Sequence, residues 1–198
     1  MKDHFKEKSQ TWDEESVRVD GAKNIAHAIH ATIPLTKEME IMDFGVGTGL
    51  LGFEIAKLTK KVYGVDISPS MIEKLIEKNR PELHIETFCQ DIIKEPLSQS
   101  FDGIISSMTL HHIENLEEFF TTIYKNIKEN GFIAIADLES EDGTFHSDNS
   151  DVFHFGFDEK ELCRIVSACG FQDIKFKHIN TINKPEKNYG IFLLTAKK

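Results

Sequence analysis

The chain has 198 residues, 40% of them hydrophobic and 28% charged, and a formal net charge of −10 at pH 7. This length fits a single domain, 1–198, whose core needs no disulfide or metal. The acidic balance argues against a nucleic-acid partner, and the three cysteines form no CxxC pair of the kind found in zinc sites. The N-terminus lacks the apolar core of a signal peptide and no apolar run approaches a membrane span, so we expect a cytoplasmic protein without membrane contact.

The N-terminal part begins with a polar stretch and continues with helical periodicity. Apolar residues recur at helical spacing from Val19 to Ile29, which predicts an amphipathic helix over 17–33 that ends at Pro34. We expect residues 1–35 to form a helical cap over a cofactor and substrate site.

From residue 40 onward, short apolar segments alternate with helical patterns. Ser68, Asn115 and Asp158 each stand where a helix cap is expected. Asn130-Gly131 indicates a turn into a strand. We expect strands at 40–44, 61–66, 83–89, 101–107 and 132–136, and helices at 50–58, 69–79, 116–127 and 158–170. This alternation predicts an α/β fold with a parallel sheet and helices on both faces.

The C-terminal part departs from that alternation. Two strands near 171–178 and 189–196 have no helix between them, so they are expected to pair as an antiparallel hairpin. Residues 139–157 are long, polar and without periodicity. A connection of that length inside a compact domain is usually functional or mobile, so we expect a lid there.

A glycine-rich turn, DFGVGTG at 43–49, follows the first strand. Glycine lets the backbone approach a ligand because no Cβ stands in the way. The turn has two interpretations. In one, GTGLLG at 47–52 matches the dinucleotide fingerprint, with Asp66 placed to bind a ribose. In the other, the Asp43 carboxylate, which would repel a pyrophosphate, attracts the ammonium and sulfonium end of S-adenosylmethionine.

Five sequence pieces, taken in order, resemble class I S-adenosylmethionine-dependent methyltransferases of the small-molecule type. These pieces are DFGVGTG (43–49), VYGVDIS (62–68), CQDI (89–92), FDGIISSMTLHHI (101–113) and NGFIAIAD (130–137). The resemblance covers the chain from residue 36 to its end. It implies a Rossmann-like seven-stranded sheet in the order 3-2-1-4-5-7-6, mostly parallel with the last strand antiparallel. It also implies S-adenosylmethionine as the cofactor.

The resemblance also implies a set of cofactor contacts. Asp66 would hold the ribose hydroxyls, Ile67 would cover the adenine, and Asp91 would accept a hydrogen bond from the adenine amino group. Without the resemblance, Asp91 would be read as a turn cap and Asp66 as a solvated strand end. The implied cofactor-binding residues are Asp43, Gly45, Gly47, Gly49, Asp66, Ile67, Asp91, Ile92 and Ser107.

His111 and His112 are the candidate catalytic residues. They follow the fourth strand, and ligands of open α/β sheets bind beyond the carboxyl ends of strands. We expect one of them to contact the methyl acceptor as a base or hydrogen-bond partner, while the alternative is that they cap a helix or pack on the sheet. Spacing does not decide which one faces the site. His146 and His154 match no known metal-ligand spacing, so no metal is expected.

These observations predict a methyltransferase acting on an unidentified small-molecule acceptor. The fourth strand continues as SSMT and lacks the N/D-P-P-Y/F signature of amino-group nucleic-acid methyltransferases, which argues further against nucleic acid. Two alternatives stay open: an NAD-dependent oxidoreductase that uses the GTGLLG turn, and a non-catalytic cofactor-binding partner subunit. The sequence identifies neither the acceptor nor the oligomeric state.

Overall fold

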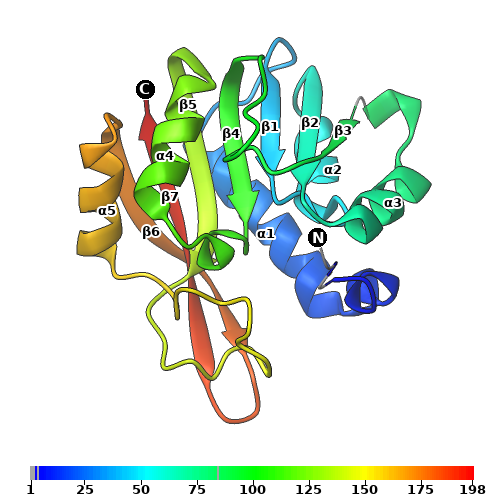
Figure 1. The fold of residues 1–198 in the computed structure, drawn as a ribbon, viewed down its shortest axis with the longest axis vertical. Coiled ribbons are helices and arrows are strands. Elements are labelled where there is room, and N and C mark those ends of the chain that lie inside the picture. The colour runs from blue at the N-terminus through cyan, green and yellow to red at the C-terminus, as the bar shows by residue number, and fades with distance from the viewer. Residues whose placement is uncertain (1–2, 4, 84) are drawn as a thin grey trace.

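The computed structural model describes residues 3, 5–83 and 85–198, so the parts of the predicted cap and third strand that fall on residues 1, 2, 4 and 84 lie outside it. Its strands form one seven-stranded sheet in the order β3-β2-β1-β4-β5-β7-β6 (Figure 1). Neighbouring strands from β3 to β5 pair in parallel, and β7 is antiparallel to both β5 and β6. The predicted fold class and strand order are confirmed.

The helices and strands occur in the predicted order along the chain. The strands are β1 Glu40–Phe44, β2 Lys61–Asp66, β3 Ile85–Cys89, β4 Phe101–Ser107, β5 Ile127–Leu138, β6 Gln172–Asn183 and β7 Asn188–Lys197. The helices are α1 Ser16–Thr32, α2 Leu50–Ala56, α3 Pro69–Lys78, α4 Leu116–Lys125 and α5 Glu159–Ala168. Within the described part of the chain, none of these helices is long and apolar enough to cross a membrane.

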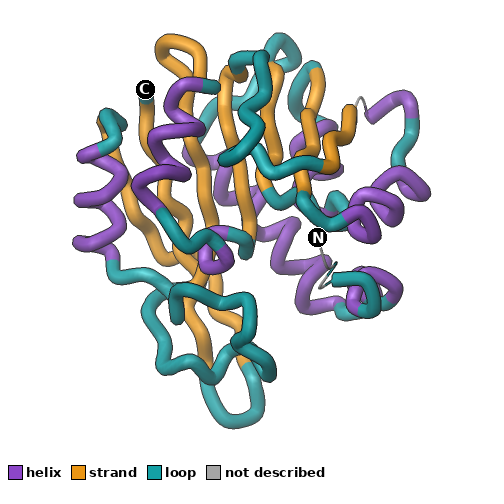
Figure 2. The backbone as a smooth tube through the Cα atoms, viewed as in Figure 1, coloured by secondary structure: helices purple, strands orange, loops and turns teal. Residues whose placement is uncertain are grey.

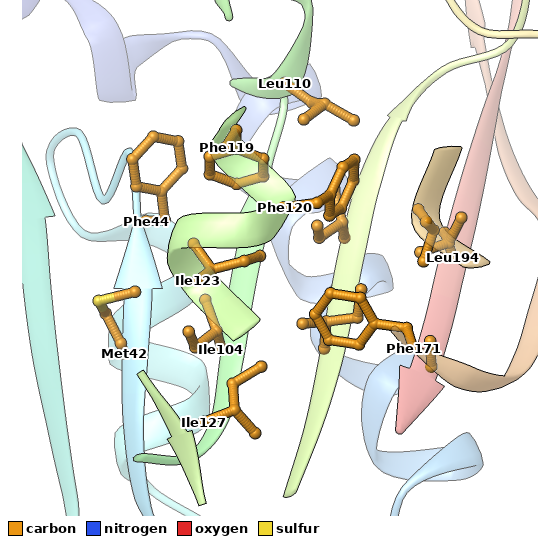
Figure 3. Packing of buried hydrophobic residues seen from close by; sticks show 14 of the residues in the cluster. Met42, Phe44, Ile104, Leu110, Phe119, Phe120, Ile123, Ile127, Phe171 and Leu194 are labelled. Carbon is orange, nitrogen blue, oxygen red and sulfur yellow. The ribbon is translucent and has the colours of Figure 1, made fainter. Parts of the chain in front are cut away.

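Helices cover both faces of the sheet because its central strands are apolar on both (Figure 2). Successive strand residues point to opposite faces. Met42 packs in the cluster formed with α4 and α5, whereas its neighbour Ile41 packs in the cluster formed with α1, α2 and α3. Figure 3 shows the first of these clusters, in which Phe119 and Phe120 of α4 are fully buried. Two continuous cores therefore hold the strand ends in place.

The predicted helix caps are confirmed. The Ser68 hydroxyl accepts a hydrogen bond from Met71 N at 3.3 Å at the start of α3. Asn115 and Asp158 cap α4 and α5 in the same way, each accepting from backbone N–H groups of the first turn. Gly170, with a φ of 99°, closes α5 as expected.

The boundaries of four strands differ from the prediction. β3 begins at Ile85, because Leu83 lies in the 3-10 turn Pro81–Leu83. β5 begins at Ile127, which pairs with β4, but the next pairs with β4 and β7 begin at Phe132, so Asn130 and Gly131 form the expected turn within the bounds of the strand. Asn130 has a φ of 64° and the pairing register with β4 shifts nearby, which is how a strand accommodates such a residue. β6 and β7 are longer than predicted because their mutual pairing continues to Asn183 and Asn188, beyond the last pair with β5.

Three segments meet at the carboxyl edge of the parallel strands (Figure 1). They are the N-terminal segment 5–15, the 3-10 turn Leu110–His112 after β4, and the segment 139–157. The ring of Phe5 lies 5.9 Å from the ring of His112. The fold thus places the predicted cap and the predicted lid beside the candidate histidines.

Candidate functional site

The glycine turn exposes its backbone toward open space. Gly45 N and Val46 N both donate to Val65 O, at 2.9 and 3.0 Å, which fixes the turn between β1 and β2. Gly45 has a φ of 68°, and a Cβ there would lie 2.3 Å from the Thr109 side chain. Gly47 has a φ of 52°, but a Cβ there would meet nothing within 4 Å. Gly45 is therefore required for packing, whereas Gly47 borders a space that a ligand can use.

Asp43 is a buried residue, and one of its carboxylate oxygens has no hydrogen-bond partner among the described residues. The residue is 1% exposed, and the oxygen in question is Oδ2. Burial, together with the nearby charge of Asp66, raises the pKa of Asp43 well above its ordinary value, although a hydrogen bond from Gly52 N acts against this. An unsatisfied buried polar group costs about 1–3 kcal/mol. A cationic hydrogen-bond donor on a ligand would satisfy this oxygen.

Asp66 lies at the end of β2 next to the same turn. Its carboxylate oxygens accept hydrogen bonds from Gly47 N at 2.8 Å and Ser68 N at 2.9 Å. Burial raises the pKa of Asp66 above its ordinary value, and these two hydrogen bonds oppose the shift. Because a carboxylate oxygen can accept more than one hydrogen bond, the group can bind ribose hydroxyls while it holds the turn.

Ile67 and Ser107 lie at the carboxyl edge as the sequence predicted. Ile67, which directly follows Asp66, is 54% exposed, so its apolar side chain is open to contact. Ser107 is the last residue of β4, adjacent to Ser106, which pairs with Phe44 of β1. Both positions are consistent with contact to a ligand bound at the glycine turn.

The structure places Asp91 and Ile92 after β3. The Asp91 carboxylate accepts from Ile93 N at 3.1 Å and forms an ion pair with Lys94 at 2.7 Å. Burial would raise the pKa of Asp91, but the bonds from Lys94 and Ile93 outweigh it and the pKa is lowered. Ile92 is only 1% exposed, backbone and side chain together, and packs in the cluster formed with α4 and α5. The adenine contact of Asp91 stays a prediction, and the carboxylate also serves as a turn cap.

His111 and His112 are neighbours in the chain but have different hydrogen-bond partners. β4 ends at Ser107, and Met108 has a φ of 55°, which turns the chain into the 3-10 turn. His111 is 1% exposed and its Nδ1 lies 2.7 Å from a carboxylate oxygen of Asp137, a residue that is itself fully buried. Because a carboxylate only accepts, Nδ1 carries the hydrogen and Nε2 of a neutral ring carries a lone pair.

The Nε2 atom of His111 has no hydrogen-bond partner in the described part of the structure, although it is buried. Burial alone would raise the pKa of Asp137, but the interaction with His111 and hydrogen bonds from Leu138 N and His111 N lower it. Asp137 is therefore an ionised partner that orients the ring and stabilises its protonated form. His111 can accept a proton at Nε2.

His112 and His146 complete the cluster around His111. His112 donates from Nδ1 to Asp151 O at 2.6 Å. His146, from the segment 139–157, lies with its ring 4.8 Å from that of His111. Burial and the neighbouring rings lower the pKa of His112, and they lower the pKa of His146 to about 4. Both rings are therefore neutral at neutral pH.

Sequence reasoning missed Asp137, although a carboxylate at the end of the apolar strand run FIAIAD needs a buried partner. It considered His146 together with His111 and His112 only as metal ligands, and otherwise as part of a polar lid. Because the segment that carries His146 follows no periodic pattern, the sequence did not place its ring. Among the described residues, no group of three His, Cys, Asp or Glu side chains is arranged to hold a metal ion.

The N-terminal segment is fastened to the glycine-turn side of the site. Asp3 accepts hydrogen bonds from Ser68 Oγ at 2.8 Å and Ser70 N at 3.1 Å. Asp13 accepts from Thr48 Oγ1 at 2.6 Å. Together with the contact of Phe5 and His112, these bonds place the segment over the carboxyl edge.

Trp12 and Arg18 are engaged with each other. The Arg18 guanidinium lies 4.1 Å from the Trp12 ring centroid and forms an ion pair with Glu15 at 3.1 Å. Trp12 also contacts the Phe5 ring, at 6.0 Å, so it packs within the N-terminal segment.

The family model described as "Methyltransferase domain" matches residues 35–188 of this chain. An uncharacterized methyltransferase of Schizosaccharomyces pombe is 34% identical over 118 residues, which are 54% of this chain and 42% of that protein. The mitochondrial ubiquinone biosynthesis O-methyltransferase of the same yeast is 26% identical over 153 residues, 69% of this chain and 54% of that protein. The chain spans about half the length of these curated relatives.

A solved structure shows the same fold. Phosphoethanolamine N-methyltransferase 2 of Haemonchus contortus, in complex with S-adenosyl-L-methionine, matches with a TM-score of 0.71 at 17% identity. The match covers 89% of this chain and 52% of that chain. At this identity the likeness concerns the fold alone.

Proposed function

Because the chain belongs to the methyltransferase-domain family, we propose that it transfers a methyl group from S-adenosylmethionine to a small-molecule acceptor. One observation supports this choice of cofactor most directly. Asp43, whose buried Oδ2 has no hydrogen-bond partner among the described residues, begins the turn in which Gly47 borders open space. A buried carboxylate at this point favours a cationic ligand and disfavours the pyrophosphate of a dinucleotide.

The residues present fit S-adenosylmethionine. Asp43 would bind its ammonium group, the backbone at Gly47 would leave room for the aminocarboxypropyl arm, and Asp66 would accept from the ribose hydroxyls. Ile67 offers an exposed apolar surface for the adenine. The Haemonchus contortus enzyme of the same fold was solved in complex with this cofactor. When bound, this cofactor supplies an electrophilic methyl group on a sulfonium.

On the acceptor side, His111 is the residue that takes the proton. Its Nε2 lone pair is fixed by the bond from Nδ1 to Asp137, and both groups are buried. Water is thereby kept from the base, and Asp137 stabilises the imidazolium that forms. His112, whose Nδ1 donates to a backbone carbonyl of the segment 139–157, holds that segment against the site.

Ligand-dependent melting tests the cofactor assignment. S-adenosylhomocysteine should raise the melting temperature because it binds the native state, and NAD should leave it unchanged. A calorimetric titration in which NAD binds more tightly than S-adenosylhomocysteine would overturn the proposal. A screen of small acceptors with methyl-labelled S-adenosylmethionine then tests the transfer itself.

A further inference from the structure

Two buried ring nitrogens beside the turn after β4 have no hydrogen-bond partner among the described residues. They are Nε2 of His111 and Nε2 of His146. Their rings lie 4.8 Å apart with planes inclined by 40°. The ring of His112 lies 4.1 Å from His111 and 6.0 Å from His146. We call these three residues the histidine trio.

The two nitrogens can play complementary roles. His111 Nε2 accepts a hydrogen bond, because Nδ1 of the same ring donates to Asp137. His146 can carry its hydrogen on Nε2 and donate. Two nitrogens that bond to one oxygen lie up to about 6 Å apart, and the centroids of these two rings are 4.8 Å apart. A group that both donates and accepts, such as a hydroxyl, would satisfy both nitrogens.

The charges around the trio disfavour an anionic acceptor. Burial and the neighbouring His111 lower the pKa of His112, and burial, His111 and His112 lower the pKa of His146, while the carboxylates that act on these rings are Asp137 and Asp151. Lys184 is the cation that acts on His146, and its ammonium group donates to Phe145 O and lies over the Phe145 ring. A carboxylate or phosphate would therefore be bound beside acidic groups by rings without charge.

Aromatic rings flank the trio on two sides. Phe145 lies 4.8 Å from His146, and Phe5 lies 5.9 Å from His112. Ring faces and edges of this kind pack against an apolar body and favour aromatic partners. The surroundings of the trio therefore suit an acceptor that is apolar apart from its reacting group.

We propose that the acceptor is a neutral hydroxyl compound with an apolar, ring-sized body, and that its oxygen is held between Nε2 of His111 and Nε2 of His146. This assignment rests on the proposed function. In the transfer, the acceptor oxygen bonds to the methyl carbon while the carbon–sulfur bond breaks and its electron pair goes to sulfur. The hydroxyl proton goes to His111 Nε2, and Asp137 stabilises the resulting charge. An amine can react through its lone pair before it loses a proton, so a buried base at this point indicates a hydroxyl.

Nitrogen-15 spectra of the histidine side chains test this without turnover. The protein is first saturated with S-adenosylhomocysteine, and that binding is measured by calorimetry. Phenol, its methyl ether anisole, and aniline are then added separately at neutral pH. Phenol should shift the Nε2 resonances of His111 and His146, whereas anisole and aniline should leave them in place. Equal shifts with anisole, larger shifts with aniline, or a response to Zn²⁺ in place of phenol would overturn the assignment.

Variants of His146 supply the second measurement. His146→Gln keeps an N–H donor and should retain phenol binding within about threefold, whereas His146→Leu should weaken it about tenfold or more. His154→Gln is the matched control, because His154 lies on the same segment but bonds to Ile113 O. If His146→Leu binds phenol as well as the His154→Gln control, the assignment is wrong while the proposed function stands. Failure to bind S-adenosylhomocysteine would contradict both.

Discussion

Asp43 is a residue at which stability and binding oppose each other. The carboxylate is buried, one oxygen has no partner among the described residues, and its pKa is raised mainly by burial. A carboxyl group whose pKa is higher in the folded state than in the unfolded state destabilises the folded protein at high pH. This destabilisation increases as the pH rises from the unfolded-state pKa to the folded-state pKa. Such unsatisfied groups are typical of binding sites, because the ligand supplies the missing partner.

We therefore expect Asp43→Asn to raise the melting temperature of the free protein at neutral pH and to weaken S-adenosylhomocysteine binding. The lost charge-assisted hydrogen bond is worth about 1.5–3 kcal/mol, or about a tenfold to hundredfold change in affinity. Scanning calorimetry and titration calorimetry measure the two effects. Asp20→Asn, an exposed substitution on α1, is the control. Unchanged affinity would remove Asp43 from the cofactor site.

The two adjacent histidines have different expected roles. His111 is bonded to a buried carboxylate, while His112 bonds to a backbone carbonyl. His111→Gln should lower methyl transfer about a hundredfold or more because the base is lost, and His112→Gln should act chiefly on stability. S-adenosylhomocysteine affinity should change little in either variant, since the glycine turn and Asp66 are untouched. The measurement is the turnover rate of both variants on a confirmed acceptor. A near-normal rate for His111→Gln would mean that the enzyme needs no base and works by positioning acceptor and cofactor alone.

At the scale of elements, the segment 139–157 connects β5 to α5. It contains no helix, and only Glu139 forms a bridge, to Phe157. It is attached to the turn after β4 by bonds from Phe153 N and His154 N to His111 O, at 3.0 and 3.3 Å. A segment held by few backbone bonds opens at low free energy.

We expect this segment to be a lid that orders on ligand binding. Amide hydrogen exchange between residues 139 and 157 should slow when S-adenosylhomocysteine and a hydroxyl ligand such as phenol are added together. Exchange in β1, at the centre of the parallel region, serves as the internal reference. Equal protection with and without both ligands would show a fixed structural loop instead.

At the scale of the whole molecule, the buried imidazoles link stability to pH. Burial lowers the pKa of His112, and it lowers the pKa of His146 from 6.5 to about 4. A histidine with a depressed pKa binds its proton more readily in the unfolded chain. The free energy of unfolding should therefore fall as the pH drops from about 6.5 toward about 4 and should be unaffected by these groups at higher pH.

Urea unfolding at a series of pH values checks this linkage. His146→Gln should flatten the decline between about pH 6.5 and 4, because one of the groups that take up protons on unfolding is gone. His27→Gln, at an exposed position on α1, is the matched control. A variant of His146 with the same slope as the wild type would mean that its ring is already solvated in the folded protein.

The sequence by itself determined the order and type of the elements, the helix caps at Ser68, Asn115 and Asp158, and the glycine turn. These features depend on residues close together in the chain, whose hydrophobic period, capping chemistry and backbone freedom are local. The carboxyl-edge location of Asp66 and the histidines followed from the same pattern, because parallel strands bring their ends to one edge. The resemblance to a methyltransferase added the strand order.

Only the tertiary structure decided which groups meet at that edge. It paired His111 with Asp137 and placed His146 beside them. It also extended β5 back to Ile127, which pairs with Phe101 of β4 on the far side of the turn-like Asn130. Asp137 is 26 residues from His111 in the chain, and His146 belongs to a segment without periodicity. Their contacts with His111 therefore depend on how the whole chain packs. No local pattern encodes them, so the acceptor side of the site became visible only in the folded molecule.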